Sequence, residues 1–144
     1  MDGPPKILIL EDDVLVAWSL REVLTLVGWK VIGTAATVND ALCQAEITRP
    51  DLAIVDVRLP GNRDGIEGGR LLRQQFGIPV IILTGEIDRE TARRAAEIEP
   101  AGYLMKPVHG NQLVTAVRRA MSTAGWILIK AGRLPSVRSG RLPR

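Results

Sequence analysis

Short apolar runs alternate with longer amphipathic stretches along most of the chain. The apolar runs are rich in isoleucine, leucine and valine, which is typical of strands buried on both faces of a sheet. Between the runs, apolar residues recur at intervals of three and four, which is typical of helices with one buried face. The pattern therefore predicts strands and helices in alternation.

The predicted strands lie at 7–10, 29–33, 52–55, 80–83 and 102–105, and the predicted helices at about 16–27, 40–49, 66–76, 88–97 and 111–123. Gly28 is placed to end the first helix, and Asn39 or Asp40 is placed to cap the second. This alternation predicts an α/β fold with a doubly wound, five-stranded parallel sheet and five helices. Ligands of such sheets bind at the carboxyl ends of the strands.

The composition of the 144 residues, 46% hydrophobic and 24% charged, is that of a folded domain and excludes wholesale disorder. A single cysteine, Cys43, excludes a disulfide framework and favours a reducing compartment. No apolar run approaches the ~20 residues of a membrane helix, and the first residues lack a signal pattern. We therefore expect a cytoplasmic protein with no membrane partner.

The net charge of +3 arises at the C-terminal end. Residues 125–144 hold five basic side chains and no acidic one, whereas residues 1–124 hold 14 basic and 16 acidic side chains. We expect a mildly acidic domain at 1–124, a basic flexible tail at 125–144, and nucleic-acid contact only through that tail. An alternative is that the apolar cluster Trp126–Ile129 docks on the domain or on a second chain.

Polar side chains with catalytic potential follow four of the predicted strands. Glu11 and Asp12 follow the first strand, Asp56 the third, Thr84 the fourth and Lys106 the fifth. Carboxylates gathered at one sheet edge repel each other unless a cation joins them, and hard oxygen ligands select Mg²⁺. A lysine and a hydroxyl beside them suit a phosphoryl group, and Asp56 is the best candidate nucleophile.

Other residues are given structural roles. No Ser-His-Asp set is found, since the one histidine, His109, lies in a loop context three residues past Lys106, and no glycine-rich phosphate loop follows a strand. We expect Asp13 to cap a helix and His109 to lie in a loop. Three further residues are expected to pack against the domain: Cys43, Trp18 and Trp29.

Four segments resemble the receiver domain of bacterial two-component response regulators, and the resemblance covers about residues 5–124. These segments are Ile7–Asp13, Ile54–Pro60, Val80–Gly85 and Gly102–Pro107. The resemblance implies that Asp56 accepts phosphate from a histidine kinase or a histidine phosphotransfer protein. It also implies that Mg²⁺ is held by Glu11, Asp12, Asp56 and the backbone carbonyl of Arg58.

The same resemblance implies a switch. Lys106 would pair with the phosphoryl oxygens, Thr84 would turn its hydroxyl onto them, and Tyr103 would move inward. The face formed by the helix 88–97, the strand 102–105 and the helix 111–123 would change and could pair with a second copy. The Lys106-Pro107 bond resembles the family's cis peptide.

The sequence departs from the family pattern at its loops. The loop 59–65 is about two residues longer than the commonest version. Arg58 and Glu86 occupy positions that, in the family, tune how fast the aspartyl phosphate hydrolyses. We hypothesise that these two side chains face each other across the site mouth and hinder the attacking water.

The resulting interpretation is a stand-alone receiver that signals through protein–protein interaction and is not an enzyme beyond its own phosphorylation and dephosphorylation. One alternative is a Mg²⁺-dependent phosphatase or phosphotransferase of the haloacid dehalogenase type. Such enzymes carry a second aspartate two residues after the nucleophile, where this chain has Arg58. The other alternative is a binding module that ignores phosphate, which would not need the acidic, hydroxyl and amine set.

Overall fold

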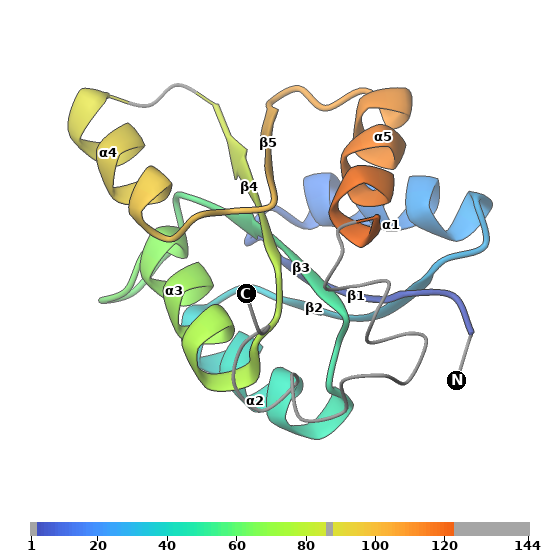
Figure 1. Cartoon of the computed structure of the whole chain (residues 1–144), viewed down its shortest axis with the longest axis horizontal. Coiled ribbons are helices and arrows are strands. Elements are labelled where there is room, and N and C mark those ends of the chain that lie inside the picture. The colour runs from blue at the N-terminus through green and yellow to red at the C-terminus, as the bar shows by residue number, and fades with distance from the viewer. Residues whose placement is uncertain (1–2, 86–87, 123–144) are drawn as a thin grey trace.

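The computed structural model describes residues 3–85 and 88–122 (Figure 1). The elements are β1 (Lys6–Leu10), α1 (Val14–Leu26), β2 (Lys30–Ala35), α2 (Val38–Thr48), β3 (Leu52–Asp56), α3 (Gly65–Phe76), β4 (Val80–Thr84), α4 (Arg89–Glu97), β5 (Gly102–Met105) and α5 (Gly110–Met121). All neighbouring strands are parallel, in the order β2-β1-β3-β4-β5. The predicted α/β fold, doubly wound with five strands and five helices, is confirmed.

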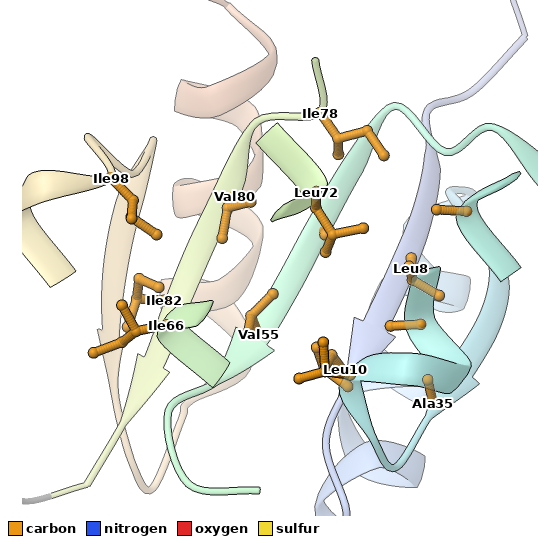
Figure 2. Packing of buried hydrophobic residues seen from close by; sticks show 14 of the residues in the cluster. Leu8, Leu10, Ala35, Val55, Ile66, Leu72, Ile78, Val80, Ile82 and Ile98 are labelled. Carbon is orange, nitrogen blue, oxygen red and sulfur yellow. The ribbon is translucent and has the colours of Figure 1, made fainter. Parts of the chain in front are cut away.

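The core forms two apolar layers, one on each face of the sheet. Helices α2, α3 and α4 cover the face that carries Leu8, Val55 and Ile82 (Figure 2). Helices α1 and α5 cover the opposite face, which carries Ile9 and Ile54. Every residue of β3 and β4 is buried, so the strand that ends at Asp56 is closely packed along its whole length.

The residue that caps α1 is the predicted one, whereas the residue that caps α2 is not. The Asp13 carboxylate caps α1 as predicted, accepting from Leu15 N at 2.9 Å. The prediction that Asn39 or Asp40 caps α2 is wrong, because Thr37 has the extended backbone of a cap and its hydroxyl accepts from Asp40 N at 3.1 Å. Asp40 therefore lies in the first helical turn, where its negative charge is favourable.

Two residues predicted to pack against the domain are exposed instead. Helix α2 buries Val38, Ala41 and Ala45, and Cys43 is turned well away from that face. Trp18 is 59% exposed because its neighbour Ala17 occupies the buried face of α1.

Trp29 packs against the domain as predicted, and His109 lies at the start of a helix. Trp29 is half-buried against the α1–α5 layer, with the Arg118 guanidinium 5.6 Å from its ring centroid. His109 occupies the N-cap position of α5, and its backbone N donates to Gln112 Oε1 at 3.3 Å. Across 3–85 and 88–122, no helix combines the length and apolar character that a membrane crossing requires.

Candidate functional site

The carboxyl ends of β1, β3, β4 and β5 place the predicted side chains in one crevice. Asp56 is the last residue of β3, Thr84 is the last of β4, and both are buried together with Glu11. Lys106 Nζ lies 2.7 Å from Asp56 Oδ2 and 3.0 Å from Glu11 Oε1. Residues up to 95 positions apart in the chain thus meet through parallel strand order alone.

Backbone hydrogen bonds fix the loops that carry these groups. Glu11 N donates to Ala35 O at 2.9 Å, which extends the β1–β2 ladder beyond β1. Lys106 N donates to Thr84 O at 2.7 Å, and the Lys106-Pro107 peptide is cis, as the resemblance implied. The lysine side chain therefore starts from a backbone held directly against the end of β4.

Three carboxylates form an acidic cluster at this edge of the sheet. Oxygens of Glu11, Asp12 and Asp56 all lie within 4.8 Å of one another. Burial raises the pKa of Glu11 to about 7, the Asp13 amide and Lys106 oppose the rise, and Asp56 adds to it. Burial lowers the pKa of Lys106, but its bonds to Asp56 and Glu11 outweigh this and raise it overall. The cluster carries more negative charge than one lysine balances, which suits a divalent cation.

A small hollow opens beside the acidic cluster. It has a volume of about 240 Å³ and is lined by Asp56, Val57, Arg58, Thr84, Gly85 and Lys106. The Thr84 hydroxyl is buried and finds no hydrogen-bond partner among the described residues. A buried hydroxyl without a partner is unfavourable. An oxyanion bound in the hollow would give this hydroxyl an oxygen to which it can donate.

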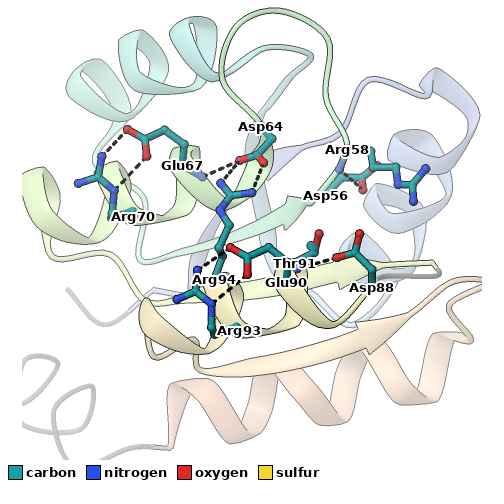
Figure 3. Close-up of polar contacts among 10 residues, drawn as sticks. All are labelled: Asp56, Arg58, Asp64, Glu67, Arg70, Asp88, Glu90, Thr91, Arg93 and Arg94. Atoms are coloured by element: carbon teal, nitrogen blue, oxygen red, sulfur yellow. Dashed lines mark hydrogen bonds and ion pairs between the residues drawn. The ribbon is translucent and has the colours of Figure 1, made fainter.

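Arg58 lies at the mouth of the hollow, next to Asp56. Arg58 N donates to Asp56 Oδ1 at 3.1 Å (Figure 3). The hypothesis that Arg58 faces Glu86 falls on a residue outside the described ranges. The hypothesis therefore stays a prediction. The pKa of Asp88 is lowered first by its hydrogen bonds to Thr91 and also by the positive charge of Arg58.

Tyr103 occupies an outward position on β5. Its side chain is 49% exposed, and Met105 on the same strand is 63% exposed. Tyr103 therefore does not line the hollow, whereas Glu11, Asp12, Asp56, Thr84 and Lys106 are gathered at one edge of the sheet.

Sequence reasoning missed a charged contact next to the site. Asp64 caps α3 through a bond from Glu67 N at 3.0 Å, and it also accepts from both terminal nitrogens of Arg94, at 2.8 and 3.1 Å. The Asp-Gly pair at the start of a helical pattern could have indicated the cap. No local signal identifies a partner thirty residues away.

A family model for the response regulator receiver domain matches residues 7–118. The chain belongs to the response regulator receiver family. Among solved structures, this receiver resembles the signal receiver domain of a modulated diguanylate cyclase from Desulfovibrio desulfuricans, with 37% identity and a TM-score of 0.80, covering 83% of this chain and 94% of that one. It also resembles a putative response regulator from Chloroflexus aurantiacus, with 33% identity and a TM-score of 0.76, covering 84% of this chain and all of that one.

Curated relatives of the receiver are longer proteins. The transcriptional regulatory protein PdtaR of Mycobacterium tuberculosis is 34% identical over 119 residues, which is 83% of this chain and 58% of PdtaR. The transcriptional regulatory protein AfsQ1 of Streptomyces coelicolor is 36% identical over 117 residues, or 81% of this chain and 51% of AfsQ1. The chain thus spans somewhat over half the length of these relatives. Receiver domains of this family are signalling switches of two-component systems rather than enzymes in the usual sense.

Proposed function

We propose that the receiver accepts a phosphoryl group on Asp56 from a phosphohistidine of a kinase or phosphotransfer protein. An Asp56 oxygen attacks phosphorus, the phosphorus–nitrogen bond breaks, and the imidazole leaves with the bonding electron pair and takes up a proton. The chain itself assists this transfer but turns over no separate metabolite. The observation that carries the proposal is the Lys106 ammonium, 2.7 Å from Asp56, beside the unpartnered Thr84 hydroxyl.

The acidic cluster fits a magnesium ion by the chemistry of its donors. Glu11, Asp12, Asp56 and the backbone carbonyl of Arg58 would hold it. A bound Mg²⁺ supplies positive charge that offsets the phosphoryl oxygens. Lys106 contributes the same kind of stabilisation from the protein itself, since its ammonium already lies on the Asp56 carboxylate.

Phosphorylation is proposed to act on the surface formed by α4, β5 and α5. The Thr84 hydroxyl gains a phosphoryl oxygen as acceptor, and Tyr103 turns inward from its exposed position. The changed surface would then bind a downstream protein or a second copy of the chain. We further propose a cytoplasmic location and a receiver spanning 1–124 with a basic tail at 125–144, where the tail and the Trp126–Ile129 cluster lie outside the described residues.

An apolar patch beside the acidic cluster suits the phosphoryl donor. Val14, Leu15 and Trp18, at the start of α1, are 78%, 76% and 59% exposed. They lie two to six positions after Asp12 in the chain, so a protein docked on them would bring its histidine toward the carboxylates. Exposed apolar groups near a polar site are typical of a docking surface.

The test is incubation with a small-molecule phosphodonor and Mg²⁺, followed by intact mass. The wild-type chain should gain one phosphoryl group and Asp56→Asn should gain none. Asp12→Asn should raise the Mg²⁺ concentration that the reaction requires. Asp13→Asn, which keeps a capping side chain, should leave that concentration unchanged. Continuous release of phosphate from a separate substrate would favour a phosphatase, and no modification at all would favour a phosphate-blind module.

A further inference from the structure

Helix α4 has little apolar contact with the rest of the protein. Of its nine residues, only Ala95 is buried. Arg93 pairs with Glu90 and Glu97 of the same helix, so these contacts do not hold α4 in place. Arg94 is different, because its guanidinium reaches across to Asp64, which lies before α3 (Figure 3).

Asp64 is itself fixed to the backbone that carries Asp56. It caps α3, and the next residue, Gly65, donates its N–H to Val57 O at 2.8 Å. A Cβ added at Gly65 would lie 1.6 Å from the carbonyl oxygen of Asp56, so the start of α3 rests directly on that peptide group. The carboxylate bound by Arg94 therefore belongs to a segment that is hydrogen-bonded to Val57 and packed directly against the backbone of Asp56.

The other end of α4 leads to Thr84. The helix is capped by Asp88, four residues after Thr84 in the chain. The Arg94–Asp64 ion pair thus joins α4 to the segment next to Asp56. Asp56 and Thr84 line the same hollow, of about 240 Å³.

We propose that the Arg94–Asp64 pair is a clamp that positions α4 relative to Asp56 and opposes a movement of α4 when a phosphoryl group binds there. The pair is bidentate and about one third exposed on each side chain. Burial alone would raise the pKa of Asp64, but the bond from Arg94 and the Glu67 amide lower it, in keeping with a tight pair. The effect on switching rests on the proposed function, whereas the mechanical link does not.

Hydrogen exchange of the full chain without a phosphodonor tests the link. Asp64→Asn keeps the α3 cap and removes the charge, so it should speed amide exchange in α4 about two- to fivefold. Arg94→Gln should speed amide exchange at residues 65–68 by a similar factor, although Arg94 lies on α4 and these residues lie on α3. Amide exchange in the double variant should be no faster than in either single variant. Arg93→Gln is the matched control, since it breaks pairs inside α4 and should leave residues 65–68 unchanged.

Titration with beryllofluoride and Mg²⁺, which mimic the phosphoryl group, tests the effect on switching. Arg94→Gln and Asp64→Asn should bind it about two- to fivefold more tightly than the wild type, and Arg93→Gln should match the wild type. If exchange at 65–68 is the same in all variants, the clamp does not exist. Faster exchange with unchanged affinity would overturn its role in switching. A wild-type chain that binds no beryllofluoride would overturn the proposed function and that role with it, while the exchange data would still decide the clamp.

Discussion

Replacing Gly65 with alanine is expected to disrupt the backbone around the proposed phosphoacceptor. The new Cβ would lie 1.6 Å from Asp56 O, 2.6 Å from Asp56 C and 3.0 Å from Val57 Cα. All three are backbone atoms of a fully buried region, so no side-chain rotation can relieve the overlap. The start of α3 must move away from β3 for the methyl group to fit.

The size of the effect follows from these distances. Ordinary contact begins near 3.4 Å, so α3 must shift by about 1.8 Å against a close-packed strand. Overpacking of this kind costs typically 1–3 kcal/mol, and contact with rigid backbone places the expected loss of unfolding free energy at about 3 kcal/mol. For a domain of about 120 residues this lowers the melting temperature by about 10 °C.

Thermal unfolding of Gly65→Ala and Gly110→Ala measures the effect against a matched control. Both glycines are first residues of a helix, but a Cβ at Gly110 would meet only Val23 methyl groups, at an ordinary 3.6 Å. Gly110→Ala should therefore unfold at or slightly above the wild-type temperature, since alanine favours helix. A Gly65→Ala melting temperature within about 2 °C of the wild type, or an equal fall in both variants, would refute the reasoning.

Three further predictions concern the docking patch, the hydroxyl and the clamp. Trp18→Ala should slow phosphotransfer from a phosphohistidine protein about tenfold without changing the rate with a small-molecule donor. Ile47→Ala, which changes an exposed apolar residue on α2, should change neither rate, and a loss with both donors for Trp18→Ala would contradict a docking role. Thr84→Val should raise the unfolding free energy by about 1 kcal/mol in denaturant titrations and should weaken beryllofluoride binding. A less stable variant would show that the hydroxyl has a partner in the protein. Because the pKa of Asp64 is lowered in the folded state, the stability difference between wild type and Arg94→Gln should be constant above about pH 5 and shrink as pH falls below about 4; a difference that persists at pH 2 would mean that Arg94 stabilises by packing rather than charge.

The sheet and the site residues could be predicted because each depends on local pattern and one topological rule. Apolar runs place the strands, and parallel strands bring Asp56, Thr84 and Lys106 to one edge wherever the connecting helices run. The end of β2 was missed because Thr34, a polar residue, interrupts the apolar pattern of an edge strand that is only partly buried.

Features that depend on helix rotation or on distant partners were not predictable in this way. The burial of Ala17 rather than Trp18 is decided by how α1 sits on the sheet, and residue type alone favours the larger side chain. The Arg94–Asp64 contact joins a residue inside α4 to the N-cap of α3, and several arginines on α3 and α4 were equally plausible partners from spacing alone.

The exposed position of Cys43 has a practical consequence for experiments on self-association. It is the single thiol of the chain, and it lies on α2, which contributes no residue to the hollow at Asp56. In aerated buffer two molecules can become covalently joined there, and such a product would imitate pairing through the α4–β5–α5 surface on a sizing column. The same thiol accepts one maleimide dye or biotin per molecule, which gives a single defined attachment point while the phosphoacceptor stays free.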